Sequence, residues 1–292
     1  MTNTQNHSPG VPVNTPASLV EITIDGTPVK IRKGQTILDG CNAAGIDTPT
    51  LCYLEGLTPV NVCRVCVVEV EGSRTLVPSC SRPAEEGMAV QTDSERVRHS
   101  RRMVLEFLDS SVDTSLATEL NQWSRHYETD TARYGSQPAT VAQPVKIQDN
   151  LFIRNYDQCV LCYKCVEACG DDAQQSYAIA VAGRGFDAHI STEFDEELPE
   201  SACVYCGNCI GVCPTGALMF KSEYDMRQAG EWNEEEQSVT TTVCSYCGVG
   251  CNLELHVQDD TIVKVTSPQD HEVTNGHLCV KGRFGWQYVH GE

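Results

Sequence analysis

The sequence predicts an α+β protein made of several small units. Alternating apolar and polar residues from Leu19 to Asp25 predict a strand, and Asp25-Gly26 supplies a turn into a second strand at residues 29–32. Residues 36–44 then indicate a short helix that ends at Gly45. The chain has 292 residues, too many for a small disulfide-stapled scaffold, yet it has 17 cysteines. Compact α+β units whose thiols bind metal account for both observations.

The distribution of cysteines and of polar segments divides the chain into six parts. Strands are also expected at residues 65–70 and 76–77, a helix at 94–108 with Ser94 as its N-cap, and a hairpin around Asp259-Asp260. The six expected parts are a disordered tail (1–18), an α+β unit (19–93), a helix followed by a cysteine-free linker (94–150), a unit with two cysteine runs (151–228), an acidic linker (229–238) and a strand-rich unit (239–292).

The charge of the chain excludes several classes of partner. The formal net charge is −19, so the chain lacks the basic footprint that nucleic acid or an anionic membrane requires. No apolar run approaches the roughly 18 residues that span a bilayer, and the N-terminus shows no signal-peptide pattern. We therefore expect no nucleic-acid partner, no membrane insertion and a cytoplasmic location, where thiols stay reduced and available for metal.

Sixteen of the 17 cysteines fall into four groups of four, and Cys41 stands apart. Cys41 lies on the predicted first helix near an apolar face, so we expect a buried thiol that binds no metal. The four groups are Cys52-x10-Cys63-x2-Cys66-x13-Cys80, Cys159-x2-Cys162-x2-Cys165-x3-Cys169, Cys203-x2-Cys206-x2-Cys209-x3-Cys213, and Cys244-x2-Cys247-x3-Cys251-x27-Cys279.

The doubled C-x2-C-x2-C-x3-C run predicts two [4Fe–4S] clusters. A cubane cluster needs four thiolates, and such a run supplies three corners while a distant cysteine closes the fourth. Zinc sites usually pair two separate C-x2-C knuckles instead. In two-cluster ferredoxins the fourth cysteine of each run binds the other cluster. The expected ligand sets are therefore Cys159, Cys162 and Cys165 with Cys213, and Cys203, Cys206 and Cys209 with Cys169.

The first and last groups are interpreted as iron–sulfur sites with zinc as the alternative. Two close cysteines flanked by two distant ones give the first group the shape of a plant-type [2Fe–2S] loop, after the strand, hairpin and helix order of a β-grasp ferredoxin. The last group has a 27-residue gap, so spacing alone leaves a structural zinc open there. Because three other iron–sulfur motifs occur in the same chain, a third [4Fe–4S] cluster is favoured here, bound by Cys244, Cys247, Cys251 and Cys279.

The order of these four motifs resembles the N-terminal half of the α-subunit of NAD-dependent molybdenum or tungsten formate dehydrogenases. By the same resemblance, the large subunit of respiratory complex I is a more distant relative. The resemblance covers most of residues 19–292 and implies a molybdopterin-oxidoreductase type of fold for the strand-rich unit. The stretches that carry it are 49–70 (PTLCYLEGLTPVNVCRVCVVEV), 159–169 (CVLCYKCVEAC), 180–190 (AVAGRGFDAHI), 203–218 (CVYCGNCIGVCPTGAL) and 278–289 (LCVKGRFGWQYV).

The resemblance also implies cofactors and partners. In that family the last cluster lies beside a molybdenum or tungsten bis-pterin guanine dinucleotide cofactor, and a lysine two residues after the last cysteine bridges the two. Here that lysine is Lys281, an expected electron relay toward the pterin. The implied function is that of an iron–sulfur electron-transfer subunit of a formate dehydrogenase-like complex, without a complete catalytic site on this chain. The implied partners are a molybdopterin-containing catalytic subunit and a subunit with FMN, NAD and its own iron–sulfur clusters.

Two features depart from the family pattern. The family carries an extra cluster with one His and three Cys ligands after the helix at 94–108, but those positions here are Ser110, Thr114 and Ala117. We therefore expect this cluster to be absent, with His99 as an exposed helical residue. Only 13 residues follow Cys279, whereas the family's molybdenum-binding domains run much further, so we expect those domains on a separate chain, with a truncated chain as the alternative.

Other interpretations stay open. A bidirectional hydrogenase has an electron-transfer subunit that shares the first three groups and should lack the fourth, and a free-standing multi-cluster ferredoxin needs no enzyme partner. Residues 183–188 match the loose pattern G-x-G-x-x-A, but their context indicates a turn and not a dinucleotide site. The acidic run at 193–200 is expected to be a solvated loop, with a partner-docking surface as the alternative.

Overall fold

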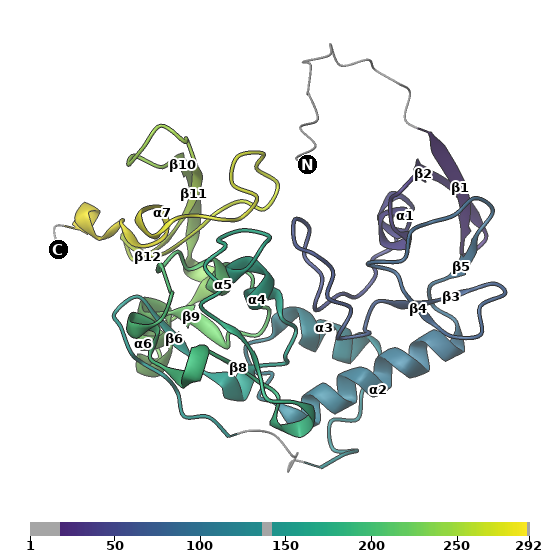
Figure 1. Ribbon diagram of the computed structural model, residues 1–292, viewed down its shortest axis with the longest axis horizontal. Helices are drawn as coiled ribbons and strands as arrows, with labels where there is room; N and C mark the ends of the chain where they lie inside the picture. The colour runs from purple at the N-terminus through teal and green to yellow at the C-terminus, as the bar shows by residue number, and fades with distance from the viewer. Residues whose placement is uncertain (1–17, 136–141, 291–292) are drawn as a thin grey trace, which may run out of the picture.

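The computed structural model describes residues 18–135 and 142–290 (Figure 1). The predicted disordered tail lies outside the described residues, apart from Ser18. Within the described ranges the chain is a mixed α+β protein with sheets of five, three, two and two strands. None of the helices in these ranges combines the length and the apolar character that a membrane crossing requires.

The N-terminal unit is a five-stranded sheet covered by one helix. The strands have the order β2-β1-β5-β3-β4, with β1 antiparallel to β2 and parallel to β5. Gly40 brings the helix against the sheet, because a Cβ atom there would lie only 2.8 Å from Ile22 Cδ1. The elements are β1 (Leu19–Ile24), β2 (Thr27–Arg32), α1 (Ile37–Ala43), β3 (Val67–Val70), β4 (Val77–Pro78) and β5 (Ala89–Gln91).

Two helices follow, and the second was not expected from the sequence. Helix α2 (Glu95–Ser111) begins as predicted, with the Ser94 hydroxyl accepting from the Val97 amide at 3.3 Å. Residues 118–126, which the sequence analysis assigned to a linker, form helix α3 (Thr118–His126). Its apolar side chains pack against α2 in a shared core, so the linker prediction is wrong for this segment.

The middle unit is built around the antiparallel pair of β6 and β9 and a core that includes Phe152, Ile190 and Leu218. Residues 183–188 connect the two strands of a hairpin, and Gly183 has φ +69°, so the predicted turn is confirmed. The elements are β6 (Phe152–Arg154), η1 (Tyr156–Gln158), α4 (Lys164–Cys169), β7 (Ala180–Ala182), η2 (Gly185–Asp187), β8 (His189–Ser191), η3 (Glu193–Asp195), η4 (Leu198–Glu200), α5 (Asn208–Gly211), β9 (Leu218–Phe220) and α6 (Lys221–Ala229).

The C-terminal unit is a three-stranded antiparallel sheet with one short helix. Asp259 and Asp260 both have positive φ, as a tight hairpin turn requires, which confirms the predicted hairpin. The elements are η5 (Glu234–Glu236), β10 (Ser238–Val243), β11 (Asn252–Gln258), β12 (Thr261–Thr266), α7 (Val280–Phe284) and η6 (Gln287–His290).

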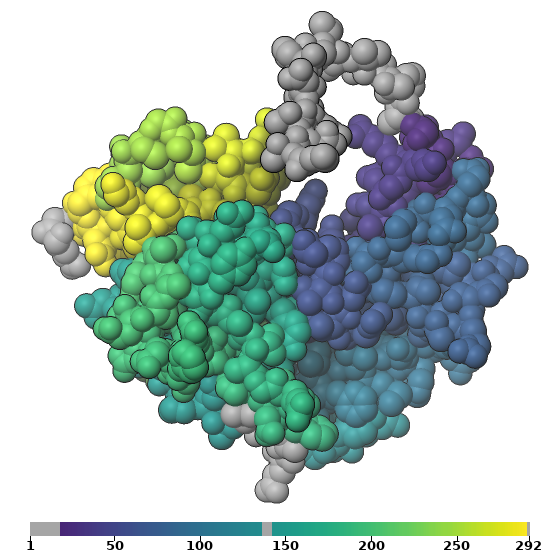
Figure 2. Space-filling view, viewed as in Figure 1, coloured from purple at the N-terminus to yellow at the C-terminus, as the bar shows by residue number. Residues whose placement is uncertain are grey.

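Helix α7 joins the C-terminal unit to the middle unit. Phe284 lies between Phe152 and Phe220 of the middle core, with ring centroids 6.2 and 5.6 Å away. Figure 2 shows the yellow C-terminal segment resting directly on the green middle unit. On the other side, the Thr58 amide and hydroxyl donate to the Asp172 carboxylate at 2.6 and 2.9 Å, which ties the first cysteine loop to the end of α4.

Candidate metal centres

The first set is Cys52, Cys63, Cys66 and Cys80, and the structure brings its thiols together as two pairs. A hydrogen bond from Cys63 lowers the pKa of Cys52 to about 6, and a hydrogen bond from Cys80 lowers the pKa of Cys66 to about 6. The two donating thiols have raised pKa values because each shares its proton with its partner. A binuclear cluster, in which two thiolates bind each iron, matches a site made of two thiol pairs.

Backbone amides also point at this first set. Asn61 and Arg64 have φ of +62° and +58°, which turns the loop sharply around the sulfurs. Hydrogen bonds from the backbone of Asn61, Val62 and Cys63 to Cys52 contribute to its lowered pKa. Amides folded inward in this way stabilise thiolates, which are the form that binds iron.

The second set (Cys159, Cys162, Cys165 and Cys213) and the third set (Cys203, Cys206, Cys209 and Cys169) each surround a small cavity. A cavity of about 20 Å³ is lined by all four cysteines of the second set. A separate cavity of about 30 Å³ is lined by all four cysteines of the third set. The structure therefore groups the cysteines as two-cluster ferredoxins do, in a crossed pattern. The last cysteine of each run lies beside the first three cysteines of the other run.

Burial and mutual repulsion raise the thiol pKa values in these two sets. Burial raises the pKa of Cys159 to about 12 and that of Cys162 to about 11, and in both cases the Cys213 charge adds to the shift. Burial also raises the pKa of Cys165 and that of Cys209 well above the usual value. Thiols with raised pKa values lose their protons at neutral pH only when a cation stabilises the thiolates, and bound iron supplies that positive charge.

A repeated backbone conformation forms the two loops, and the sequence analysis did not foresee it. Leu161 and Tyr163 in the first run have φ of +51° and +65°, and Tyr205 and Gly207 at the same places in the second run have +56° and +70°. The turn lets the Tyr205 amide donate to the Cys203 sulfur at 3.4 Å. The signal was present in the sequence as an internal repeat, but three of the four positions are not glycine, so a left-handed conformation was not indicated.

The fourth set (Cys244, Cys247, Cys251 and Cys279) lies at the surface of the C-terminal unit. Cys244 is buried and its amide donates to the Cys251 carbonyl oxygen at 2.8 Å, whereas Cys247 and Cys279 are exposed. Burial raises the pKa of Cys251, and the charges of the other three thiols add to the shift. The long gap in the sequence is therefore closed in space, and one side of the set faces solvent.

The first three sets are electrostatic neighbours in sequence order. The Cys52 charge contributes to the raised pKa of Cys162, which connects the first and second sets. The Cys209 charge contributes to the raised pKa of Cys165, which connects the second and third sets. The third and fourth sets are linked by a hydrogen bond, because the Leu278 amide beside Cys279 donates to Asn208 Oδ1 at 2.9 Å.

The donor chemistry of the four sets fits iron–sulfur clusters. Each set offers four cysteines, and the second and third sets leave room between them. Over residues 18–135 and 142–290, no group of three or more His, Cys, Asp or Glu side chains is arranged to hold a metal ion.

Cys41 and the positions of the expected extra cluster lie apart from these sets. Cys41 is fully buried in the core under the five-stranded sheet, as predicted. The Ser110 hydroxyl donates to the Phe107 carbonyl oxygen, Thr114 donates to Asp109, and Ala117 is buried. His99 is exposed on α2, as predicted.

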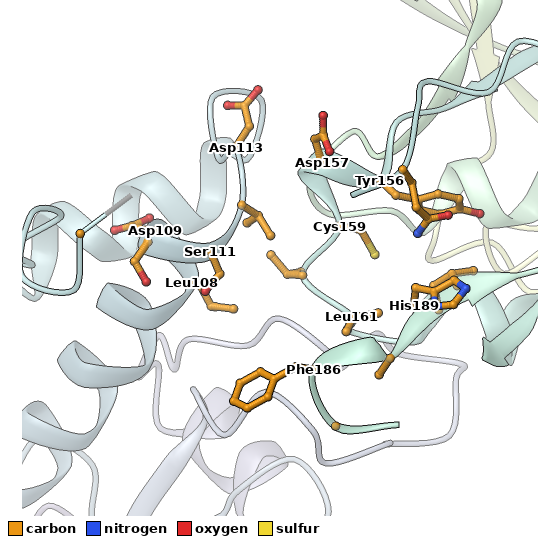
Figure 3. Close-up of a pocket in the computed structure, with 18 of the residues that line it drawn as sticks. Leu108, Asp109, Ser111, Asp113, Tyr156, Asp157, Cys159, Leu161, Phe186 and His189 are labelled. Carbon is orange, nitrogen blue, oxygen red and sulfur yellow. The ribbon is translucent and has the colours of Figure 1, made fainter. Parts of the chain in front are cut away.

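A pocket of about 620 Å³ lies between the end of α2 and the second set (Figure 3). Asp109 and Asp113 line it from the α2 side, and Cys159, Phe186 and His189 line it from the middle unit. Burial raises the pKa of Asp109. Cys159 of the second set therefore borders this open pocket.

Lys281 lies at the exposed edge of the fourth set. Its side chain is exposed, and its Nζ atom lies 6.0 Å from the centre of the Tyr246 ring, at the limit of a cation–π contact. Tyr246 in turn donates to the Gly285 carbonyl oxygen at 2.5 Å. The lysine therefore lies at the surface, near the Tyr246 ring and not in the core.

Comparison with known proteins assigns a domain type to each unit. Residues 17–95 match the 2Fe-2S iron-sulfur cluster binding domain, and residues 151–219 match the NADH-quinone oxidoreductase subunit 3, ferredoxin-like domain. Residues 237–291 match the molybdopterin oxidoreductase Fe4S4 domain. The chain carries iron–sulfur domains of three kinds. These three domains contain the first set, the second and third sets, and the fourth set, respectively.

Curated oxidoreductase subunits are similar to this chain over most of its length. A NADH-quinone oxidoreductase subunit of Rhizobium meliloti is 32% identical over 280 residues, which are 93% of this chain and 32% of that protein. NADP-reducing hydrogenase subunit HndD of Solidesulfovibrio fructosivorans is 38% identical over 212 residues, 69% of this chain and 36% of that protein. The chain therefore spans about a third of the length of these relatives.

A solved structure shares the arrangement of much of the chain. A chain of a NAD⁺-reducing [NiFe]-hydrogenase, in the H2-reduced state, superposes with a TM-score of 0.60 and 26% identity. The match covers 69% of this chain and 87% of that one. The similarity extends across more than one of the iron–sulfur domains, because no single domain accounts for that share of the chain.

Proposed function

We propose that this chain is an electron-transfer subunit that carries single electrons between a flavin-containing, NAD(P)-linked subunit and a separate catalytic centre. The observation that carries this proposal is the succession of the four cysteine sets, each beside the next, from the first set to the exposed fourth set. Iron–sulfur clusters supply one-electron transfer without bond rearrangement in the substrate. A chain that places four such sites in succession is suited to electron conduction.

The proposal assigns all sixteen cysteines as ligands. The first set would hold one [2Fe–2S] cluster, and the second, third and fourth sets would each hold one [4Fe–4S] cluster. The thiol pairs of the first set and the two cavities of the middle unit support these assignments. The protein would tune each site through burial, amide hydrogen bonds to sulfur and nearby charge.

The exposed fourth set is the proposed contact with the catalytic partner. Apolar side chains at Val249, Tyr288 and Val289 are 55–61% exposed and belong to the same unit as the solvent-facing Cys247 and Cys279. Burying such side chains favours docking of another protein surface. The domain type of residues 237–291 supports a molybdopterin-bearing partner, with Lys281 as the relay, and formate as the substrate follows from the family resemblance.

A hydrogenase complex is the second candidate, and the comparisons support it equally. A hydrogenase subunit is among the relatives, and a hydrogenase chain is the structural neighbour. In that case the electrons would come from a nickel–iron centre on the catalytic partner. The same line of cysteine sets serves both candidates, so the metal of the partner discriminates between them.

Anaerobic native co-purification with metal analysis tests the proposal. We expect the chain to elute with a flavin-containing subunit and with a second component that contains molybdenum or tungsten, together with formate-dependent NAD⁺ reduction. Nickel and hydrogen-dependent activity would select the hydrogenase candidate. A monomer with its full iron content and no companion would contradict both and indicate a free-standing carrier.

A further inference from the structure

Arg283 is a fully buried arginine at the junction of the middle and C-terminal units. It lies on α7, four residues after Cys279, and its exposed fraction is 0%. Burying a guanidinium is costly unless its charge is compensated. The location and the partners of this charge therefore call for an explanation.

The hydrogen-bond partners of Arg283 are neutral. Its Nη2 atom donates to Asn208 Oδ1 at 3.2 Å and to the Gly276 carbonyl oxygen at 3.3 Å, and Nη1 donates to the Val265 carbonyl oxygen at 3.4 Å. Arg283 makes no salt bridge with any residue in the described part of the chain. Carbonyl oxygens orient the guanidinium but do not neutralise it.

The third set lies directly against this guanidinium. Gly207 and Gly211, in the run from Cys203 to Cys213, allow Arg283 to approach the loop. A Cβ atom on Gly207 would lie 2.9 Å from Arg283 Cγ, and one on Gly211 would lie 3.2 Å from Nη2. Asn208, which anchors the guanidinium, stands between Cys206 and Cys209 in the loop of that set. The arginine is thus fixed against the loop that supplies three of the four cysteines of the third set.

The neighbouring sulfurs favour the charged form of Arg283. Burial lowers its pKa to about 10, while the charges of Cys206 and Cys209 oppose that decrease. The arginine therefore remains a cation at neutral pH. A cluster bound by four thiolates is a net anion, and it gains one more negative charge when it accepts one electron from an external reductant. A fixed cation at this position stabilises the reduced form more than the oxidised form.

We propose that Arg283 is the buried counter-charge of the cluster in the third set and that it raises the reduction potential of that cluster. The role is a positioning one, since the side chain binds no iron and acts only through its charge. It rests on the proposed function to the extent that the third set holds a cluster. Through Asn208, which also accepts from the Leu278 amide, the same contact fixes the third set beside the fourth.

Lys164 offers a matched comparison in the second set. Lys164 precedes Cys165 in the run from Cys159 to Cys169, as Asn208 precedes Cys209 in the run from Cys203 to Cys213. The Lys164 charge opposes the rise in the pKa of Cys162. Each of the two sets in the middle unit therefore has its own neighbouring cation. Removing one cation should shift one cluster and leave the other in place.

Redox titration of the isolated, anaerobically reconstituted chain tests the inference without any partner subunit. The clusters are followed by electron paramagnetic resonance, and the two clusters of the middle unit are assigned from the signal that changes in each of the ligand variants Cys203→Ser and Cys159→Ser, where a serine oxygen replaces one cysteine sulfur. In Arg283→Met, which removes the charge and keeps an apolar side chain of similar length, we expect the reduced-to-oxidised ratio of the third-set cluster to fall about tenfold at fixed potential. That is about 59 mV for a one-electron couple.

Two further variants separate charge from packing. Arg283→Lys keeps the charge and should stay within about threefold of the parent ratio. Lys164→Gln should shift the second-set cluster and leave the third-set cluster unchanged. If Arg283→Met loses the cluster, Asn208→Ala, which releases the guanidinium from its anchor, should shift the same ratio in the same direction by a smaller factor.

The outcomes are distinguishable from those of the proposed function. An unchanged third-set potential in Arg283→Met, or in Asn208→Ala where Arg283→Met loses the cluster, overturns this inference alone. An equal shift in Arg283→Met and Arg283→Lys also overturns it, because packing and not charge would then be responsible. A parent chain that assembles no cluster at the third set overturns both this inference and the proposed ligand assignment. Loss of partner binding during co-purification affects only the proposed function.

Discussion

The middle unit encloses its cysteines, whereas the C-terminal unit exposes half of its own. Cys165 is buried and Cys209 is half-buried, and the cavities of the second and third sets lie within one apolar core. Cys247 and Cys279 face solvent. An enclosed site protects its cluster from water and keeps its potential constant, whereas an open site admits a partner. The contrast indicates an insulated interior and one open end.

Ligand substitution should give the largest difference between the two regions. In Cys209→Ser we expect loss of up to about eight iron atoms per chain, because the crossed runs hold the second and third clusters in one core and metal binding contributes to folding. In Cys247→Ser we expect loss of about four, with the other clusters retained. Iron per chain and thermal unfolding measure both.

Cys41→Ser is the control for these substitutions, since Cys41 is fully buried but belongs to no set. It should keep its full iron content even where its stability decreases. Equal iron loss in Cys209→Ser and Cys247→Ser would remove the contrast between the enclosed and the open region.

Substitution of Lys281 should have an intermediate effect that is confined to the open end. We expect Lys281→Gln to keep its iron and its cluster potentials, and to slow electron transfer to the catalytic partner at least about tenfold. Stopped-flow reduction of the clusters by the partner measures the rate. Arg227→Gln, on α6 and paired with Glu223 and Glu234, is a matched loss of positive charge elsewhere. A similar slowing in both variants would contradict a specific role for Lys281.

The pH dependence of the metal-free protein should be the smallest effect and should come from the enclosed region. The folded-state pKa values of Cys159 (about 12) and Cys162 (about 11) lie above the ordinary value of 9.0. The folded state therefore holds these protons more tightly than the unfolded state. This contribution is complete below pH 9 and is lost as the pH rises toward 11 and 12.

The free energy of unfolding should accordingly fall by about 4 kcal/mol between pH 9 and pH 11, about 2 kcal/mol from each thiol. Urea unfolding of the metal-free chain at several pH values measures this slope. Cys162→Ala should reduce it, because one of the two raised thiols is gone. A slope of opposite sign would show that these thiols are not buried in the metal-free protein.

The sequence predicted the cysteine groups and most strands because ligand spacing and alternation are local properties. It failed at α3, although Leu120, Trp123 and Tyr127 have helical spacing, because the surrounding Ser, Thr and Gln residues suggested a linker. Nothing in the sequence indicated Arg283, since its burial depends on how α7 packs on a unit about 75 residues earlier. The thiol pairs of the first set also depend on tertiary packing and not on spacing.

Counting iron and spins on one sample tests the central claim most directly. The account predicts roughly fourteen iron atoms per chain after anaerobic reconstitution, in one binuclear and three tetranuclear clusters. Full reduction should then give four paramagnetic centres once spin coupling between neighbours is included. A colourless protein, or one with fewer than four centres under these conditions, would contradict it.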